Sequence, residues 1–308
     1  MLSNLSITSL SGWVPYKLFF DNEQPLCRWL QVHDTPFSDP FFADTISKCM
    51  SNGVRQYHSL SSAELLPKLA DGLEAVEPSA FIFHISRCGS TLLSQLLDIN
   101  PHHIVLSEVP FFDELLRGSV PVLRPAIQFY GQKRTGAETH LFIKTDSWHV
   151  CFYKTLREIY PSVPFILLYR DPVEVIRSQQ KKRGMQAVPG VIDAEVFGFK
   201  DEAVNDLDVY MTKVIERYLT LFEEIITAGD RALLVNYNQG MMSVAEDVAA
   251  FTGLELSNDD REKMETRCRY NAKYPEQIFS EAAMDTAPPA YLEKCMELYR
   301  RLEKMRTL

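Results

Sequence analysis

Short apolar runs alternate with amphipathic segments over most of this chain. The runs that predict buried strands lie at 81–85, 104–106, 141–143, 164–169 and 232–235. Segments with helical spacing of their apolar residues lie between or after them, most clearly at 90–99, 148–159, 172–182, 203–228 and 241–252. Strands that alternate with helices predict an α/β fold in which helices cover both faces of a central, mainly parallel sheet.

The two ends of the chain depart from this alternation. Residues 13–20 and 27–32 resemble strands, and Asp39-Pro40 precedes a helix that we expect to reach Met50. A final helix is expected from about Ala290. The sequence thus predicts an N-terminal subdomain without an assigned role, a core, and a C-terminal helical extension packed on the core, at 1–78, 79–256 and 257–308.

Composition narrows the class of protein. The chain has 308 residues and a net charge of −9, which argues against a general nucleic-acid-binding surface. Its six cysteines form no Cys-x-x-Cys pair, and free thiols are typical of a reducing cytoplasm. The N-terminus lacks the pattern of a signal peptide, and no apolar run is long enough to span a membrane. We therefore expect a cytoplasmic protein with neither a nucleic-acid nor a membrane partner; a homodimer is compatible with the sequence.

The first candidate site is the turn after the strand at 81–85. Its residues combine one cation, one glycine and several hydroxyl groups with the start of a helix: Ser86, Arg87, Cys88, Gly89, Ser90 and Thr91. The first amides of a helix have no partner within the helix, and the helix dipole places partial positive charge there. This pattern predicts a phosphate- or sulfate-binding loop.

The loop is not that of an ATP- or GTP-binding P-loop protein. That motif has a glycine five residues before a Gly-Lys-Ser/Thr triplet. With Gly89 as the second glycine, His84 would occupy the first glycine position and Ser90 the lysine position. A nucleotide kinase of the same broad architecture remains an alternative, as does a non-catalytic nucleotide-binding protein.

The second candidate site follows the strand at 164–169. Arg170 leaves the strand, and Asp171-Pro172 forms a helix start with an N-cap and a proline at the first position. Ser178 lies eight positions after Arg170 (178 − 170), and Lys182 is one turn further. Arginine and serine can hold one phosphate from two sides. Alternatively, Arg170 pairs with a nearby carboxylate and Ser178 is solvated.

Together the two segments resemble the sulfotransferases that use 3′-phosphoadenosine 5′-phosphosulfate (PAPS), most closely the tyrosylprotein and bacterial branch. Residues 86–92 resemble the arginine variant of the 5′-phosphosulfate loop, and 169–178 resemble the 3′-phosphate motif. The resemblance covers about 79–256. It implies a three-layer fold of the P-loop type, PAPS as the sulfuryl donor, 3′-phosphoadenosine 5′-phosphate (PAP) as the product, and no metal.

The resemblance also assigns roles to single residues. Glu108 follows Arg87 by 21 positions (108 − 87), which is the place of the catalytic glutamate in that branch. Lys144 matches a lysine on the next strand. Tyr237 resembles a tyrosine near the adenosine, whereas Asn238 stands where the family usually has glutamate. Asp146 is the rival base, because cytosolic members have histidine in the corresponding Lys-Thr-His segment.

The expected reaction is transfer of the sulfuryl group from PAPS to an acceptor hydroxyl of a small molecule or peptide, by in-line displacement. Glu108 would remove the acceptor proton, and Arg87 and Lys144 would stabilise the transferring group and the leaving phosphate. We expect the acceptor to be selected by segments outside the motifs, at 1–75, 111–139 and 184–202. The histidines are expected to have structural roles, without metal-ligand spacing.

Overall fold

The computed structural model describes residues 10–33, 35–51, 59–200, 206–272, 276–278 and 288–307. The chain divides into two compact units. Unit 1 comprises 1–79 and 100–145, and unit 2 comprises 80–99 and 146–308. The boundaries predicted from sequence at 78/79 and 256/257 remain predictions.

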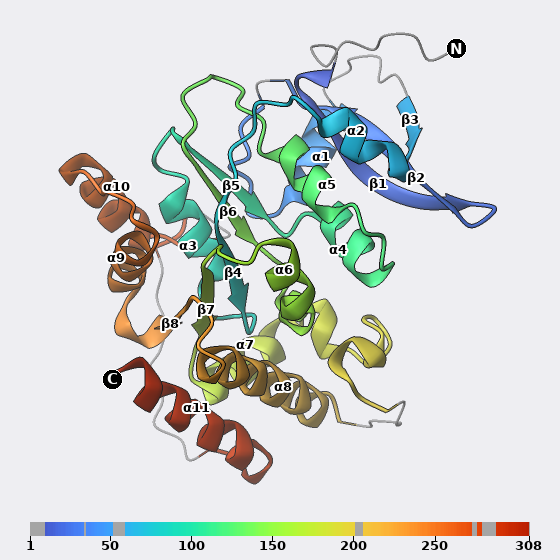
Figure 1. The fold of residues 1–308 in the computed structure, drawn as a ribbon. Coiled ribbons are helices and arrows are strands. Elements are labelled where there is room, and N and C mark those ends of the chain that lie inside the picture. The colour runs from blue at the N-terminus through green and yellow to red at the C-terminus, as the bar shows by residue number, and fades with distance from the viewer. Residues whose placement is uncertain are drawn as a thin grey trace, which may run out of the picture. The chain divides into compact units, whose positions relative to one another are not determined.

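A five-stranded sheet forms the centre of the fold, with strand order β5-β6-β4-β7-β8. Its strands are β4 (Pro78–His84), β5 (His103–Ser107), β6 (His140–Lys144), β7 (Phe165–Tyr169) and β8 (Ala232–Asn236). The β5–β6, β4–β7 and β7–β8 pairs are parallel. The predicted α/β class with a mainly parallel sheet flanked by helices is therefore confirmed (Figure 1).

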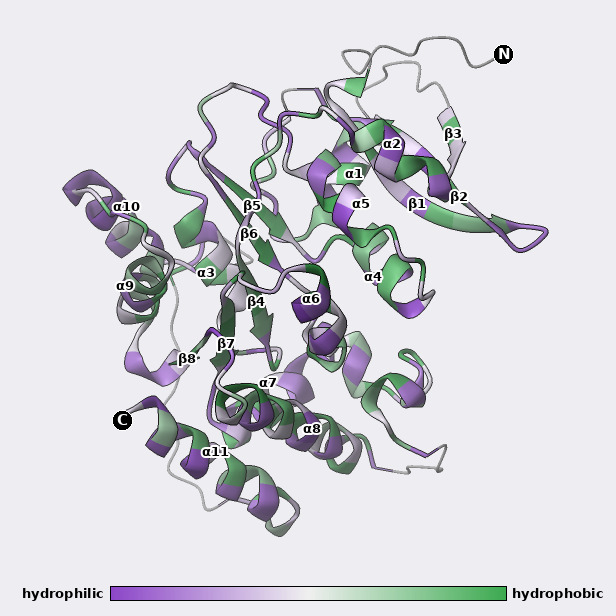
Figure 2. Cartoon of the chain, in the orientation of Figure 1, coloured by the Kyte–Doolittle hydropathy of each residue, from purple (hydrophilic) through white to green (hydrophobic). Residues whose placement is uncertain are grey.

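Burial explains why these runs form strands. Every residue of β5 and of β7 is buried, and the hydrophobic colouring of the strands is visible in Figure 2. A parallel sheet that is covered on both faces requires apolar residues without alternation, and Phe-Ile-Leu-Leu-Tyr in β7 meets that requirement.

The helices of unit 2 follow the predicted order, with α10 as a helix that the sequence did not predict. They are α3 (Ser90–Leu97), α6 (Tyr153–Ile159), α7 (Pro172–Lys181), α8 (Leu207–Thr227), α9 (Met241–Thr252), α10 (Asn258–Cys268) and α11 (Glu293–Arg306). Short 3₁₀ helices lie at Ser147–Phe152, Met185–Ala187, Ala194–Phe197, Tyr237–Gln239 and Ala290–Leu292. The start of the long helix predicted from 203 falls partly on 203–205, outside the described residues.

One detail of the α7 prediction is wrong. The sequence spacing placed Lys182 one turn beyond Ser178 on the same helical face. The helix instead ends at Lys181, and Lys182 has extended backbone angles (φ −154°, ψ 105°). The Lys182 side chain is therefore not directed by helical geometry, although its N–H still donates to the Ser178 carbonyl at 3.2 Å.

Besides β5 and β6, unit 1 contains a separate small antiparallel sheet. It consists of β1 (Trp13–Asp21), β2 (Gln24–Gln31) and β3 (Ser59–Ser62) in that order. The helices of the unit are α1 (Phe42–Ser51), α2 (Leu66–Ala70), α4 (Pro110–Arg117) and α5 (Leu123–Tyr130). The sequence predicted β1, β2 and α1, but β3 was missed because Ser-Leu-Ser-Ser has little strand character.

Three hydrogen bonds attach the β1–β2 hairpin to α4 and α5. Glu114 of α4 accepts from Leu18 N–H and from Lys17 Nζ, both at 2.5 Å. The hydroxyl of the buried Tyr130 in α5 donates to the Pro15 carbonyl at 2.5 Å. The hairpin thus packs against the segment that follows β5.

None of the described helices is long and apolar enough to cross a membrane.

Candidate nucleotide site and catalytic pair

The loop between β4 and α3 has an unusual backbone. Ser86 and Arg87 have positive φ values of 67° and 51°, and Gly89 follows with 83°. Left-handed conformations cost free energy in residues other than glycine, about 1–3 kcal/mol each, and they cluster at functional sites. Such turns also direct neighbouring N–H groups into anion-binding concavities. The loop therefore contains two left-handed residues that are not glycine, which an ordinary turn does not require.

Contacts from β7 and α7 hold this strained loop. Gln179 Nε2 donates to Ser86 Oγ at 3.2 Å, and Arg170 Nη1 donates to the Arg87 carbonyl at 3.3 Å. Arg87 Nη2 donates to the Lys182 carbonyl. All of these residues belong to unit 2, and together they offset the cost of the left-handed residues.

The side chains of the loop differ in what they offer a ligand. Cys88 is fully buried, its Sγ donates to the Leu168 carbonyl at 3.4 Å, and burial raises the pKa of its thiol to about 12. Only the backbone of Cys88 can therefore face a ligand. Ser90 and Thr91 lie in the first turn of α3, where no side chain caps the helix amides. Those amides suit an anion.

Gly89 is required by its surroundings. A Cβ at this position would lie 2.6 Å from Tyr237 Cδ2 and 2.9 Å from Met241 Sδ, and the residue has positive φ. The Tyr237 ring, which follows β8, therefore packs directly against the loop. The structure thus brings together two elements of the predicted nucleotide site that lie far apart in the sequence.

Arg170 connects the same elements. It is 6% exposed, its guanidinium carbon lies 4.2 Å from the centre of the Tyr237 ring, and Nη1 contacts the Arg87 carbonyl. Its Nε donates to Glu174 at 2.6 Å. The carboxylate pairing expected under the alternative interpretation is therefore present. It occurs together with contacts to both other predicted parts of the nucleotide site, while Ser178 is half-buried on α7.

Asn238 has a definite structural role. Its Oδ1 accepts from the Asp171 N–H at 3.3 Å, and its Nδ2 donates to Glu174 Oε2 at 3.1 Å. An amide can do both, whereas a carboxylate can only accept. The departure from the glutamate usual at this position therefore suits the presence of Glu174.

The predicted catalytic pair lies in unit 1. Lys144 Nζ is 2.8 Å from Glu108 Oε1, and the side chain of Lys144 is 0% exposed, against 21% for Glu108. Lys144 is the last residue of β6, and Glu108 directly follows Ser107, the residue of β5 that is in register with Lys144. Glu108 has a positive φ of 52°, and its N–H donates to the Lys144 carbonyl at 2.8 Å.

The Asp39–Phe42 segment encloses the lysine of this pair. Lys144 Nζ lies 3.5 Å from the Pro40 carbonyl and 5.1 Å from the centre of the Phe41 ring. A fully buried ammonium group needs such neighbours, because desolvation of an unpaired charge is costly. Glu108 therefore serves as the counter-ion of Lys144 in this structure.

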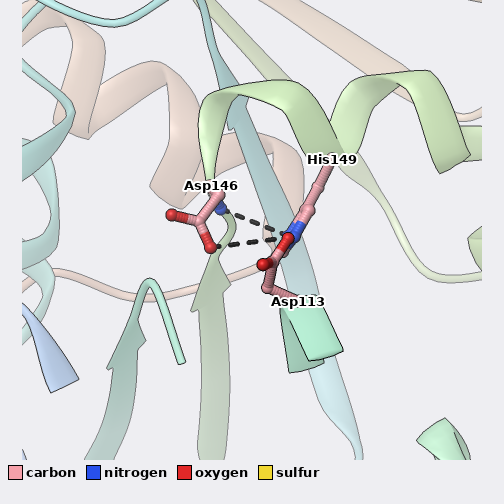
Figure 3. A group of neighbouring side chains, drawn as sticks. All are labelled: Asp113, Asp146 and His149. Carbon is pink, nitrogen blue, oxygen red and sulfur yellow. Dashed lines mark hydrogen bonds and ion pairs between the residues drawn. The ribbon is translucent and has the colours of Figure 1, made fainter. Parts of the chain in front are cut away.

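The rival base Asp146 belongs to unit 2 and is engaged locally. Its N–H donates to His149 Nδ1 at 3.3 Å, and its Oδ2 lies 3.7 Å from His149 Nε2 (Figure 3). Both side chains are buried, and Asp146 precedes the 3₁₀ helix that contains His149. This arrangement fits a role for Asp146 in starting that helix.

Sequence reasoning did not identify Gln179, Glu174 or Met241 as neighbours of the site. No spacing in the sequence shows that Gln179 reaches the loop after β4. The predicted nucleotide residues Ser86 to Thr91, Arg170, Ser178, Lys182 and Tyr237 all lie in unit 2, whereas Glu108 and Lys144 lie in unit 1.

These features define an α/β protein with an arginine-containing, left-handed loop at the end of a parallel strand. Neither a family model nor a curated protein matches the chain. Among solved structures it is similar to a sulfotransferase from Alicyclobacillus acidocaldarius, with 14% identity, coverage of 62% of this chain and 91% of the other, and a TM-score of 0.38.

Two further sulfotransferases show comparable similarity. STF9 from Mycobacterium avium is 14% identical, with 80% of each chain covered and a TM-score of 0.47. Mouse SULT7A1, solved in complex with PAP, is 12% identical, with coverage of 82% of this chain and 98% of the other and a TM-score of 0.42. Values this low carry no argument about activity, so the functional case rests on the residues.

Proposed function

We propose that this protein is a sulfotransferase that moves the sulfuryl group of PAPS to an acceptor hydroxyl. The observation that carries the proposal is the position of Arg170. Its guanidinium contacts the backbone of the Arg87 loop and the ring of Tyr237, so that the parts expected to bind the two phosphates and the adenosine adjoin one another.

In the proposed complex, the 5′ end of PAPS binds at the loop after β4. The amides of the first turn of α3, the hydroxyls of Ser90 and Thr91, and the charge of Arg87 would hold it. Arg170 and Ser178 would hold the 3′-phosphate, with Tyr237 beside the adenosine. These cationic side chains would neutralise the leaving phosphate, a task that a metal performs in many phosphoryl transferases.

Glu108 is the proposed general base. Its carboxylate would remove the proton of the acceptor hydroxyl as that oxygen attacks sulfur, and Lys144 would stabilise the charge that develops on the transferred group. The left-handed backbone of Glu108 supports this role, and its side chain, which is 21% exposed, remains accessible to an acceptor. Asp146 is the weaker candidate, because its carboxylate lies against His149.

We also propose that the protein works in a reducing compartment, the cytoplasm. All six cysteines are free thiols, and three of them are buried in the structure. The proposed acceptor is a hydroxyl of a small molecule or peptide.

The first test is a thermal melt with PAP, adenosine 5′-phosphate and ATP–magnesium. A ligand at about 100 times its Kd adds about 2.7 kcal/mol to the free energy of unfolding, so a specific donor site gives a clear rise in Tm. We expect PAP to give the largest rise. Preference for ATP–magnesium would instead favour a nucleotide kinase.

Transfer is tested separately with PAPS labelled with ³⁵S and a panel of phenols, alcohols, sugars and tyrosine peptides. Labelled product from at least one acceptor class is expected, together with release of PAP. Tight PAP binding without transfer to any acceptor would instead indicate a nucleotide-binding protein without catalysis.

A further inference from the structure

Three side chains of unit 2 form a hydrogen-bonded chain that ends at Arg170. They come from different segments: Arg170 follows β7, Glu174 lies in the first turn of α7, and Asn238 follows β8. One oxygen, Glu174 Oε2, accepts from both Arg170 Nε at 2.6 Å and Asn238 Nδ2 at 3.1 Å. The oxygen of the Asn238 amide accepts from Asp171 N–H at 3.3 Å.

The direction of each hydrogen bond in this chain is determined by chemistry. Arg170 Nε and the Asp171 N–H can only donate, and the Glu174 carboxylate can only accept. The residue at 238 must therefore accept on one side and donate on the other, which an amide does. Aspartate at 238 has nearly the same shape but would place a second carboxylate about 3 Å from Glu174, where like charges repel.

These hydrogen bonds fix the orientation of the long Arg170 side chain. Glu174 holds Arg170 at Nε, the Arg87 carbonyl holds it at Nη1, and the Tyr237 ring covers the guanidinium at 4.2 Å. Arginine recognises phosphate through a planar fork of donors, and its contribution depends on how well that plane is oriented before binding.

We propose that Glu174 and Asn238 are positioning residues that orient Arg170 for the 3′-phosphate of the donor nucleotide. The inference rests on the proposed function, because it takes the 3′-phosphate as the ligand of Arg170. Its consequence is selectivity: Glu174 and Asn238 help the protein to prefer a nucleoside 3′,5′-bisphosphate to a nucleoside 5′-monophosphate.

The test is calorimetric titration of PAP and of adenosine 5′-phosphate into the full-length wild type and N238D. Loss of a hydrogen bond to a charged group predicts about 10- to 160-fold weaker PAP binding. Binding of adenosine 5′-phosphate should be unchanged. N258D, the same substitution at the exposed start of α10, is the matched control and should leave both affinities unchanged.

A swapped pair distinguishes positioning from simple loss of folding. In the double variant E174Q/N238D, the amide and the carboxylate exchange places. In the wild type one oxygen, Glu174 Oε2, accepts from both neighbours, so the amide introduced at position 174 must turn until its oxygen faces Arg170 and its nitrogen faces the carboxylate introduced at position 238. With that rotation the hydrogen bonds can form again with one of them reversed. We expect the double variant to recover most of the PAP affinity lost in N238D, and all variants to keep the wild-type near-UV circular dichroism spectrum.

Three results would overturn the inference alone: N238D that binds PAP as the wild type does, N238D that loses both nucleotides equally, or a swapped pair no better than N238D. Wild-type protein that binds PAP no more tightly than adenosine 5′-phosphate would overturn the proposed function and the inference with it. The two failures are therefore distinguishable in one experiment.

Discussion

At the scale of single residues, strained backbone and buried charge coincide with the predicted chemistry. Ser86, Arg87 and Glu108 have positive φ, although none is glycine. All three lie at the carboxyl ends of parallel strands, where ligands of α/β proteins gather. The sequence identified these positions by motif, and their backbone strain is an independent observation that points to the same residues.

Substitution of Glu108 separates catalysis from donor binding. We expect E108Q to lower turnover by about 10²- to 10⁴-fold, because the amide cannot accept the acceptor proton. Its affinity for PAP should remain that of the wild type. Transfer of ³⁵S and calorimetry measure the two quantities.

D146N is the matched control for E108Q, since it neutralises the rival base in the same way. It should keep most of the wild-type turnover. Normal turnover of E108Q together with an inactive D146N would move the role of base to Asp146.

Removal of the Arg170 side chain tests the proposed binding of the 3′-phosphate. R170A should weaken PAP binding by about 2–5 kcal/mol, because it removes a buried cation and leaves the bound phosphate without its partner. R300A, at an exposed arginine of α11, should have no effect on PAP binding. Equal affinities of R170A and the wild type would exclude Arg170 from the site.

At the scale of elements, the C-terminal helix α11 is joined to β7 and β8 by a polar cluster. The Tyr169 hydroxyl donates to Glu303, and Arg306 donates to both Glu303 oxygens at 3.0 and 2.9 Å. Asn236 Nδ2 donates to the Tyr299 hydroxyl at 2.9 Å. The sequence predicted the helix from its periodicity, but nothing in it predicted that these polar side chains would meet strand ends.

Glu303 should make the stability of this element depend on pH. Burial alone would raise the pKa of its carboxyl, but hydrogen bonds from Arg306 and Tyr169 outweigh burial and lower the pKa below its usual value of 4.5. A lowered pKa in the folded state gives stability that is present at neutral pH and is lost as the pH falls through the folded-state pKa.

We therefore expect E303Q to reduce the free energy of unfolding by about 1–3 kcal/mol at pH 7, since hydrogen bonds to a charged group are lost. The difference from the wild type should shrink as the pH falls below 4.5. Urea unfolding at several pH values measures it. E297Q, at an exposed glutamate of the same helix, should change little, and an equal effect of both substitutions would contradict the role of Glu303.

At the scale of the whole molecule, the six free cysteines differ in how far they are exposed to solvent. Cys27, Cys88 and Cys295 are buried, whereas Cys49, Cys151 and Cys268 are partly exposed. Burial raises the pKa of each buried thiol to about 12, with nearby Glu114 adding to the effect at Cys27 and Glu216 at Cys295. Thiolate is the reactive form, so these three should resist alkylation.

Iodoacetamide at pH 8 should therefore modify native protein at partly exposed cysteines only, and more slowly at Cys151, where burial raises the pKa of the thiol to about 11. Cys88 should stay protected. Unfolding without reductant should give six adducts, one for each free thiol. Peptide mass spectrometry identifies the sites. A disulfide, or rapid native modification of Cys88, would contradict the structure around the loop.

The sequence alone determined the alternation of strands and helices from residue 81 to 252, the strand ends at which a site was expected, and the types of residue found there. It could do so because strand burial, helix capping and turn geometry depend on residues that are close in the sequence. The contacts of Arg170 with Arg87, Glu174, Tyr237 and Asn238 were decided by tertiary structure. Parallel strands join segments far apart in the chain, and local patterns do not report which side chains then meet.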